Sequence, residues 1–308
     1  MRAFLFPGQG SQAVGMGAAL AGASRTARDV FDEVDQALGQ NLFRLMRDGP
    51  EDELKLTENA QPAIMAHSIA VLRAWGIQLP DVADFVAGHS LGEYSALCAA
   101  GSFDLATTAK LLKLRGQAMQ AAVPVGQGAM AALLGADLAL AQKIAEAAAQ
   151  GEVCAVANDN DPTQVVISGH KGAIDRAIEI AKDMGAKRAV PLPVSAPFHC
   201  PLMQPAAEAM ADALGYVIVG APAIPLYANV TAQPVTDPDT IRNQLVEQVT
   251  GMVRWRESVA NMTSAGVEEF IELGGKVLAG MVKRIAPDAK VTSVVTIEDI
   301  EALAKEIA

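Results

Sequence analysis

The chain has 308 residues, which is long enough for a large core and for one big domain that carries an insertion. Apolar residues make up 51% and charged residues 19% of it, as in ordinary globular proteins and unlike disordered ones. The formal net charge of −11 argues against nucleic-acid binding, which needs clustered Lys and Arg, and against binding to anionic membranes.

The cysteine content and the apolar stretches indicate where the protein works. Three cysteines, Cys98, Cys154 and Cys200, lack the Cys-x-x-Cys spacing of many metal sites, so we expect no bound metal. An odd, sparse set is typical of reduced thiols in the cytoplasm. No apolar stretch reaches the roughly 20 residues that span a bilayer, and MRAFLFPGQG does not have the pattern of a signal peptide. We therefore expect a cytoplasmic location and no membrane.

The first part of the chain alternates short apolar runs, which predict strands, with apolar residues at helical spacing, which predict helices. The expected elements are a strand at Arg2–Phe6, helices at 26–38 and 61–75, a strand at Asp84–Ala87, and helices at about 91–100 and 104–121. This alternation favours an α/β domain.

The order of elements changes after Val123-Pro124-Val125-Gly126. The segments that follow are a strand at Ala129–Leu134, a helix at Leu138–Gln150, strands at Val153–Ala157 and Gln164–Ser168 around a polar turn, a helix at Ala173–Met184, and a strand at Lys187–Leu192. This βαββαβ order is typical of a ferredoxin-like unit. We therefore expect a small domain at 126–194, inserted into a large α/β domain formed by 1–125 and 195–308.

The large domain is expected to resume after the insertion. Its predicted elements are a strand at Ile224–Tyr227, helices near 238–249 and 255–265, a strand at Glu269–Leu273, and a short last strand at Val291–Val295. No internal repeat and no low-complexity segment interrupts this pattern.

Gly88-His89-Ser90-Leu91-Gly92 matches the G-x-S-x-G pattern between a predicted strand and a predicted helix. A sharp turn there lifts the Ser90 hydroxyl above the sheet edge and points the Leu91 amide at a developing oxyanion, where the helix N-terminus adds partial positive charge. The alternative is a glycine-rich turn in which Ser90 only caps the helix. Cys200 is a rival nucleophile, although nothing places it at an elbow.

Four histidines are candidates for a general base. His199 follows Ser90 in the chain, as in α/β-hydrolase-like enzymes, and lies in a loop that prolines stiffen on both sides. The other three are predicted to be structural: His67 on an apolar helix face, His89 too close to the nucleophile in the elbow, and His170 in a surface loop. No acidic residue stands out as a third member, which leaves a Ser–His dyad open.

Pro7-Gly8-Gln9-Gly10-Ser11-Gln12-Ala13 follows the first strand and satisfies the loose G-x-G-x-x-G/A pattern of dinucleotide sites. That fingerprint needs an acidic residue at the end of a second strand about 20 positions later. Asp32, Glu33 and Asp35 fall on a predicted helix instead, so we reject a dinucleotide site. We expect this loop to supply the Gln9 amide as the second donor of an oxyanion hole.

Arg115 lies four residues after Leu111 and four before Met119, within their apolar stripe. A cation in such a stripe either reaches out to water or needs a partner. The first interpretation is the more ordinary one. The second is that Arg115 meets a substrate carboxylate as a bidentate fork.

Together these residues resemble the malonyl-CoA:acyl carrier protein transacylase family over nearly the whole chain. The matching segments are FPGQGSQ at 6–12, GHSLGEYSAL at 88–97, LRGQAMQ at 114–120, VVISGH at 165–170, AKRAVPLPVSAPFHCPLM at 186–203 and LVEQVTGMVRW at 245–255. The resemblance implies an α/β-hydrolase-like large domain with an inserted ferredoxin-like small domain. It also implies an enzyme that moves malonyl from malonyl-CoA to the phosphopantetheine thiol of acyl carrier protein by a ping-pong reaction, for fatty acid or polyketide synthesis. No metal or redox cofactor is implied.

The resemblance also implies residue roles. Ser90 is the nucleophile, His199 the general base and acid, and the Gln9 and Leu91 amides form the oxyanion hole. Arg115 binds the malonyl carboxylate. Gln248 lies beside the histidine, where main-chain carbonyl groups take the place of a triad acid. Phe198 belongs to the form of its loop that is selective for malonyl.

Rival functions are an acyltransferase for another acyl-CoA, an esterase or lipase, and a non-catalytic binding module. Arg115 favours a carboxylated acyl group over the first. An esterase would have no use for a buried arginine in its acyl pocket and would pass the acyl group to water. A binding module would need no serine at an elbow.

Acyl carrier proteins are acidic, as this chain is, so docking needs a local basic patch. Lys187 and Arg188 lie at the start of the last strand of the predicted small domain, which leads to the His199 loop. We predict that they receive the carrier protein, against the alternative of an ordinary solvated charge cluster. The remaining candidates for docking are Arg254, Arg256, Lys283 and Arg284.

Overall fold

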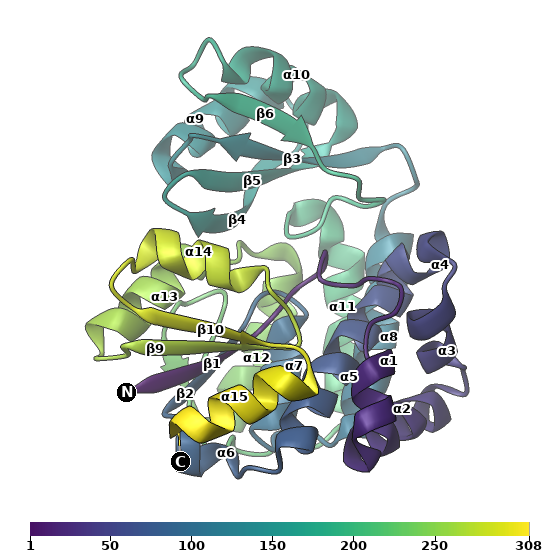
Figure 1. Cartoon of the computed structure of the whole chain (residues 1–308). Helices are drawn as coiled ribbons and strands as arrows, with labels where there is room; N and C mark the ends of the chain where they lie inside the picture. Colours follow the sequence, from purple (N-terminus) through teal and green to yellow (C-terminus); the bar gives the residue numbers. More distant parts are fainter. Residues whose placement is uncertain (308) are drawn as a thin grey trace.

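The computed structural model describes residues 1–307, which contain two β-sheets with helices packed against both (Figure 1). The larger sheet has six strands in the order β10-β9-β1-β2-β7-β8, and the smaller has four in the order β4-β5-β3-β6. In Figure 1 the smaller sheet, with helices α9 and α10, lies above the larger one. This arrangement confirms the predicted fold class.

The larger sheet is parallel except for its last strand. Its strands are β1 (Arg2–Phe6), β2 (Phe85–Gly88), β7 (Leu226–Tyr227), β8 (Pro234–Val235), β9 (Glu269–Leu273) and β10 (Lys290–Val294). Only β8 runs antiparallel to its neighbour, β7. Phe6 of β1 pairs with Gly88 of β2, so the loops that follow these two strands leave the sheet side by side. The predicted loop at Gln9 and the predicted elbow at Ser90 are therefore neighbours.

The central strand β1 is apolar throughout because both faces of the sheet are covered by helices. Phe4 and Phe6 enter one core, and Ala3 and Leu5 enter a second core on the opposite face, as the two-residue period of a strand requires. All four side chains are fully buried. A continuous apolar run thus predicted this strand correctly.

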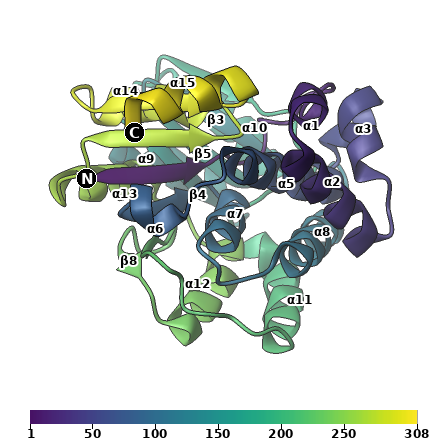
Figure 2. The ribbon, with the colours of Figure 1, turned by 60° about the horizontal axis from the view of Figure 1, so that its bottom comes forward.

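Most of the chain outside the sheets is helical. The helices around the larger sheet are α1 (Ala18–Ala23), α2 (Arg25–Leu38), α3 (Leu42–Asp48), α4 (Glu51–Lys55), α5 (Thr57–Trp75), α6 (Leu79–Val82), α7 (Gly92–Ala99), α8 (Leu105–Ala122), α11 (Gln204–Gly215), α12 (Pro238–Thr250), α13 (Trp255–Ser264), α14 (Leu278–Ile285) and α15 (Ile297–Ile307), with a 3₁₀ turn at Pro201–Met203. Figure 2 shows α2, α5, α8 and α11 packed side by side to the right of the sheet.

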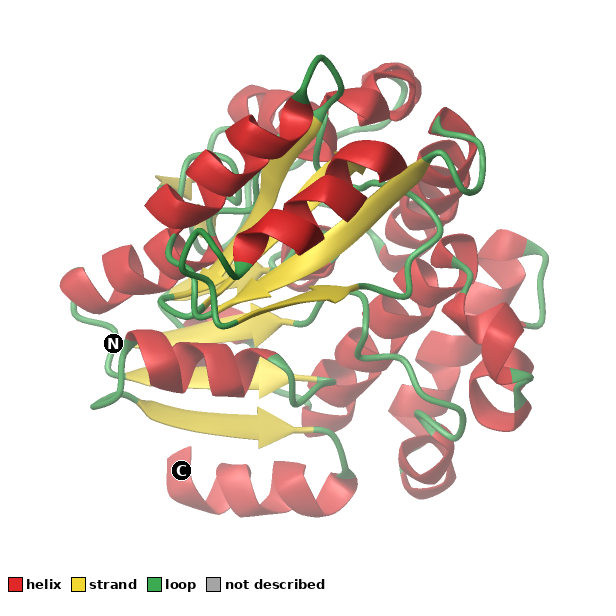
Figure 3. Ribbon diagram, turned by 90° about the horizontal axis from the view of Figure 1, so that it is seen from above, coloured by secondary structure: helices red, strands yellow, loops and turns green. Residues whose placement is uncertain are grey.

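The smaller sheet is antiparallel throughout. Its elements are β3 (Gly128–Leu134), α9 (Leu138–Ala149), β4 (Cys154–Asp161), β5 (Gln164–His170), α10 (Lys171–Ala181) and β6 (Arg188–Pro191). Figure 3, which looks down on this sheet, shows its two helices on the outer face. Leu133 and Ile167 of the sheet and Ile144 and Ile174 of the helices form a separate core there. The βαββαβ order and the strand order together make a ferredoxin-like unit, as predicted.

Strand β4 is longer than predicted, because Asn158 to Asp161 continue the strand and do not form a turn. The buried carboxylates of Asp159 and Asp161 pair with Arg256 of α13 and Arg284 of α14 at 2.8 Å each. These ion pairs join the smaller sheet to the helices of the larger one. The prediction failed here because the partners that make polar residues suitable for a buried strand lie far away in the chain.

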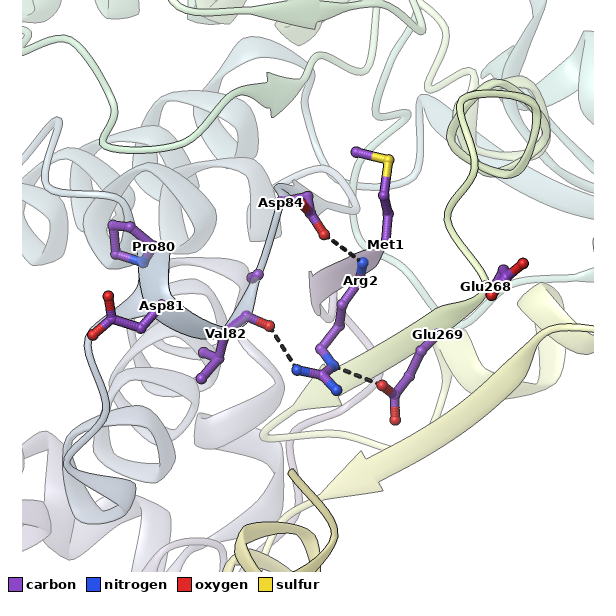
Figure 4. Close-up of a pocket in the computed structure, with 9 residues that line it drawn as sticks. Met1, Arg2, Pro80, Asp81, Val82, Asp84, Glu268 and Glu269 are labelled. Carbon is purple, nitrogen blue, oxygen red and sulfur yellow. Dashed lines mark hydrogen bonds and ion pairs between the residues drawn. The ribbon is translucent and has the colours of Figure 1, made fainter. Parts of the chain in front are cut away.

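Arg2 ties together the amino-terminal edge of the larger sheet, opposite the loops that carry Gln9 and Ser90 (Figure 4). Its main-chain nitrogen donates to Oδ2 of Asp84 at 2.7 Å, Nε donates to Oε2 of Glu269 at 2.6 Å, and Nη1 donates to the main-chain oxygen of Val82 at 2.9 Å. These bonds connect β1 to the segments that enter β2 and β9. The cavity of about 370 Å³ beside them is therefore lined by groups that secure the sheet.

Within residues 1–307, we find no helix with the length and apolar character needed to cross a membrane.

Candidate active site

Ser90 lies at a sharp turn between β2 and α7, with a φ of 55°. This left-handed conformation is uncommon for residues other than glycine and persists only when the surroundings enforce it. A Cβ atom on Gly88 would lie 1.9 Å from the carbonyl carbon of Gly92, and one on Gly92 would lie 2.2 Å from the oxygen of Phe6. Both flanking glycines are thus required by close backbone contacts, and the predicted elbow is present.

His199 reaches the hydroxyl of Ser90 from a loop after the smaller sheet. Its Nε2 lies 2.7 Å from Oγ of Ser90, and its Nδ1 lies 2.8 Å from the main-chain oxygen of Gln248. A carbonyl oxygen only accepts, so Nδ1 carries the proton and Nε2 is left free to accept one from the serine. Burial, followed by the positive charge of Arg115, lowers the pKa of His199 to about 3, so the ring is neutral at physiological pH.

Arg115 is buried beside the nucleophile, with 1% of its surface exposed, so it does not reach out to water. Nη1 donates to Oε1 of Gln61 at 2.8 Å, and Nη2 donates to Oε1 of Gln248 at 2.8 Å and to Oγ of Ser90 at 3.2 Å. The guanidinium also lies 5.7 Å from the ring centre of Tyr94. Both amide partners are neutral, so a positive charge faces the cavity next to Ser90.

The cavity at the carboxyl edge of the larger sheet has a volume of about 320 Å³. The predicted site residues that line it are Gln9, Ser90, Leu91, Arg115, Phe198 and His199. Gln9 follows β1 and Leu91 directly precedes α7, and neither main-chain amide donates a hydrogen bond to another described residue. Two free donors therefore lie at the cavity that contains the Ser90 hydroxyl. Gln248 is fully buried behind Arg115 and His199.

Asn229 also belongs to the site, although its sequence surroundings gave no motif. Its Oδ1 accepts from the main-chain nitrogen of Ser90 at 2.8 Å, and its Nδ2 donates to the main-chain oxygen of Gly88 at 2.7 Å. This side chain therefore spans the elbow and supports its unusual φ. The signal that could have found it is its place just after β7, because the carboxyl ends of parallel strands meet at one edge.

The other histidines lie where their roles are structural. His67 is buried in α5, and desolvation lowers its pKa to about 4. Nε2 of His89 lies 2.8 Å from Oδ1 of Asn160, so this ring is held away from the nucleophile. His170 ends strand β5, not a loop as predicted, and its Nδ1 accepts from the main-chain nitrogen of Val153 at 2.9 Å.

The positions of the residues concerned exclude two rival interpretations, namely Cys200 as the nucleophile and a dinucleotide site. Cys200 is fully buried, and its Sγ donates to the main-chain oxygen of Pro197 at 3.2 Å. Burial also raises the pKa of this thiol. Asp32, Glu33 and Asp35 lie within α2 and not at the end of a strand, which removes the dinucleotide fingerprint.

The predicted docking residues Lys187 and Arg188 are exposed at the start of β6. That strand leads to Leu192, which lines the cavity. Three of the four alternative cations are engaged elsewhere. Arg254 pairs with Glu257, Arg256 with Asp159, and Arg284 with Asp161.

Comparisons with known proteins agree with this geometry. A family model described as "Acyl transferase domain" matches residues 3–294. A malonyl CoA-acyl carrier protein transacylase from Escherichia coli (strain K12) is 48% identical over 92% of each chain. One from Bacillus subtilis (strain 168) is 45% identical over 97% of this chain and 95% of that protein. The chain belongs to the malonyl-CoA:acyl carrier protein transacylase family.

Solved structures of the transacylase family have the same fold. An acyl-carrier-protein-S-malonyltransferase from Bartonella henselae superimposes with a TM-score of 0.97 at 52% identity, over 99% of each chain. A type II PKS acyl-carrier protein in complex with its malonyl-transacylase gives a TM-score of 0.96 at 41% identity, over 99% of each chain. Within residues 1–307 of the present transacylase, no group of three or more His, Cys, Asp or Glu side chains is placed to hold a metal ion.

Proposed function

We propose that this transacylase moves a malonyl group from malonyl-CoA to the phosphopantetheine thiol of an acyl carrier protein, through an ester on Ser90. The observation that carries the choice of acyl group is the buried guanidinium of Arg115, 3.2 Å from Oγ of Ser90. A malonyl group attached to this serine places its free carboxylate near the guanidinium. A charge-assisted, bidentate contact then selects a carboxylated acyl group over acetyl.

The first half-reaction loads the serine. Nε2 of His199 accepts the hydroxyl proton of Ser90 as Oγ attacks the thioester carbonyl carbon. The Gln9 and Leu91 amides donate to the oxyanion of the tetrahedral intermediate. The C–S bond then breaks, His199 returns its proton to the leaving thiolate, and coenzyme A departs. Throughout, the main-chain oxygen of Gln248 holds the Nδ1 proton of His199, in place of a triad acid.

The second half-reaction reverses these roles with a new thiol. His199 accepts the proton of the phosphopantetheine thiol, whose sulfur attacks the malonyl-serine carbonyl carbon. The C–O bond to Ser90 breaks, and His199 returns the proton to Oγ. Neither half-reaction changes an oxidation state, so we propose no redox cofactor. We propose no metal either, because His199 supplies the proton transfers and the two amides supply the oxyanion contacts. Malonyl-CoA and the carrier thiol are both substrates.

Phe198 has 8% of its surface exposed and lines the cavity next to His199. We propose that its ring limits the room beside the malonyl methylene group and disfavours bulkier acyl groups. Lys187 and Arg188 are proposed to receive the acidic carrier protein. Arg188 lies about 13 Å along the chain from the cavity residue Leu192 and Lys187 about 17 Å, at the usual rise of a strand. The charge of this patch is opposite to that of the partner.

We also propose that 126–194 forms a small domain and that 1–125 and 195–308 form the large catalytic domain. The apolar core between the smaller sheet and its two helices supports this division, because all of its residues lie within 126–194. A cytoplasmic location is proposed as well, in keeping with cysteines that are free in the structure at positions 98, 154 and 200.

Mass spectrometry of the chain after mixing with malonyl-CoA tests this function. We expect one added malonyl group on the peptide that carries Ser90, and its transfer to carrier protein when that protein is added. Release of malonate to water at the same rate with and without the carrier would instead indicate a hydrolase.

A further inference from the structure

Glu93 is a buried carboxylate that the proposed mechanism does not use. It lies in the first turn of α7, three residues after Ser90, with 1% of its surface exposed. Its Oε2 accepts hydrogen bonds from Nε2 of Gln248 at 2.6 Å and from the main-chain nitrogen of Asn229 at 3.3 Å. Burying a carboxylate without a contacting cation is unfavourable, so its place beside the nucleophile calls for an explanation.

The Gln248 amide has only one favourable orientation in this structure. Its Nε2 faces three acceptors: Oε2 of Glu93 at 2.6 Å, the main-chain oxygen of Ser90 at 3.0 Å, and Oδ1 of Asn229 at 3.2 Å. Its Oε1 faces the Nη2 donor of Arg115 at 2.8 Å. A flipped amide would turn its oxygen toward three oxygens and its NH₂ group toward a guanidinium. Glu93 is the nearest of the three acceptors and the only one that can carry a negative charge.

This amide connects Glu93 to the acyl pocket. The carboxylate polarises the Gln248 amide from the nitrogen side, which strengthens the bond from Arg115 to Oε1. Gln248 and Gln61 thus hold the guanidinium from two sides, with Nη2 beside the Ser90 hydroxyl. Burial raises the pKa of Glu93 to about 7, and the Gln248 bond opposes this rise, so the contact favours the charged form.

We infer that Glu93 is a positioning residue, which aims the Arg115 guanidinium at the acyl carboxylate by holding the Gln248 amide in this orientation. The inference rests on the proposed function, because it assigns part of the malonyl preference to a residue that does not touch the acyl group. Glu93 acts on selectivity through the side chain of Gln248. The contact with His199 uses the main-chain oxygen of Gln248 and does not depend on how the amide is turned.

Three substitutions separate this role from a general contribution to packing. Glu93→Gln keeps an oxygen that can accept from Gln248 and Asn229. Glu93→Met keeps a similar volume but has no acceptor there, and Glu93→Asp keeps the charge but withdraws the oxygens by one methylene group. The measured quantity is the ratio of Ser90 acylation rates from malonyl-CoA and acetyl-CoA, determined for each folded variant.

We expect Glu93→Gln to retain most of the malonyl preference. Glu93→Met and Glu93→Asp should each lower the ratio by about tenfold or more, the effect of losing a hydrogen bond to a charged group. Glu272→Gln is the matched control, because Glu272 is also fully buried but accepts from the main-chain nitrogens of Val277 and Leu278 instead. It should leave the ratio unchanged.

A folded Glu93→Met protein with the wild-type ratio would overturn the inference. If that variant does not fold, an unchanged ratio in Glu93→Asp has the same meaning. The wild-type protein distinguishes this failure from failure of the proposed function. If the unsubstituted chain forms no malonyl ester on Ser90, the proposed function fails. If it does and the variants keep its selectivity, only the role of Glu93 fails.

Discussion

Nδ1 of His199 lies 2.8 Å from the main-chain oxygen of Gln248. A peptide oxygen does not titrate in the working range of the enzyme, so it keeps the proton on Nδ1 without adding a negative charge. No third acid contributes such a charge, and the main-chain hydrogen bonds of His199 oppose the effects of burial and of the Arg115 charge only in part, so the pKa of His199 is lowered to about 3. His199 is therefore neutral over the physiological range, as a base for a serine or a thiol must be.

Ser90→Ala should abolish the malonyl label while leaving the fold intact, because it removes only the attacking oxygen. Intact-mass measurement after mixing with malonyl-CoA checks this. Ser95→Ala is the control: Ser95 is buried in α7, five residues after Ser90, and its hydroxyl has no partner among the described residues. A label that persists on Cys200 in Ser90→Ala would exclude Ser90 as the nucleophile.

His199→Ala should slow both half-reactions by at least about 100-fold, the usual contribution of a positioned base. Stopped-flow loading from malonyl-CoA and transfer to the carrier measure the two halves separately. His170→Asn is a matched histidine control, since its amide oxygen can still accept from the main-chain nitrogen of Val153. Near-normal transfer by His199→Ala would show that His199 is not the general base.

Arg115→Ala should lower malonyl transfer and raise acetyl transfer in relative terms. The substitution removes a hydrogen bond between charged groups, which is worth roughly 1.5–3 kcal/mol. Competition between the two acyl-CoAs gives the ratio directly. Lys113→Ala, on the same helix but paired with Glu58, should leave it unchanged. An equal loss of both activities in Arg115→Ala would mean that the arginine only supports the fold.

Stability should fall on acidification, in part because of His199. Its pKa is about 3 in the folded protein and near 6.5 when unfolded, so the unfolded chain binds more protons between these values. The contribution is fully present above pH 6.5 and is lost as the pH falls toward 3, by about 2 kcal/mol between pH 7 and 5. Urea unfolding of the wild type and His199→Gln at these two pH values measures it.

Other groups near His199 also titrate, and they define the control for that experiment. Arg115 remains charged throughout, while the pKa of His89 is lowered by burial and that of Glu93 is raised. His199→Gln keeps these groups, so subtracting its pH dependence from that of the wild type isolates the histidine. An identical loss of stability in both proteins would show that His199 titrates normally in the folded state.

Reversing Lys187 and Arg188 to Glu should raise the KM for the carrier protein and weaken its dependence on salt, because both effects follow from attraction between opposite charges. Loading from malonyl-CoA does not involve the carrier and should change far less. Initial rates at low and high salt provide the comparison. An unchanged carrier KM at low salt would move the search to Arg254, Arg256, Lys283 and Arg284.

Local patterns predicted most of the long elements of this fold, although the helices α11 and α15 were missed. Arg2–Phe6 and the βαββαβ segment were recognised because apolar periodicity and turn residues are encoded by neighbours in the chain. Short helices such as α3, α4 and α14 were missed, since one or two turns leave too few residues for a period to show. The polar end of β4 was missed because its charges are compensated by helices about 100 residues away.

The residues of the site also fall into those that the sequence identified and those that only the structure revealed. The elbow at Ser90 and the loop at His199 lie in short sequence segments that resemble a known family, so their residues could be named before the fold was seen. The roles of Glu93 and Asn229 could not be predicted in this way, because the contacts of both residues with each other and with the elbow strand span more than 130 positions, and no spacing records a contact across that distance. Only the assembly of β1, β2, β7 and α12 at one sheet edge places these groups within 3.3 Å of each other, where hydrogen-bond geometry decides their roles.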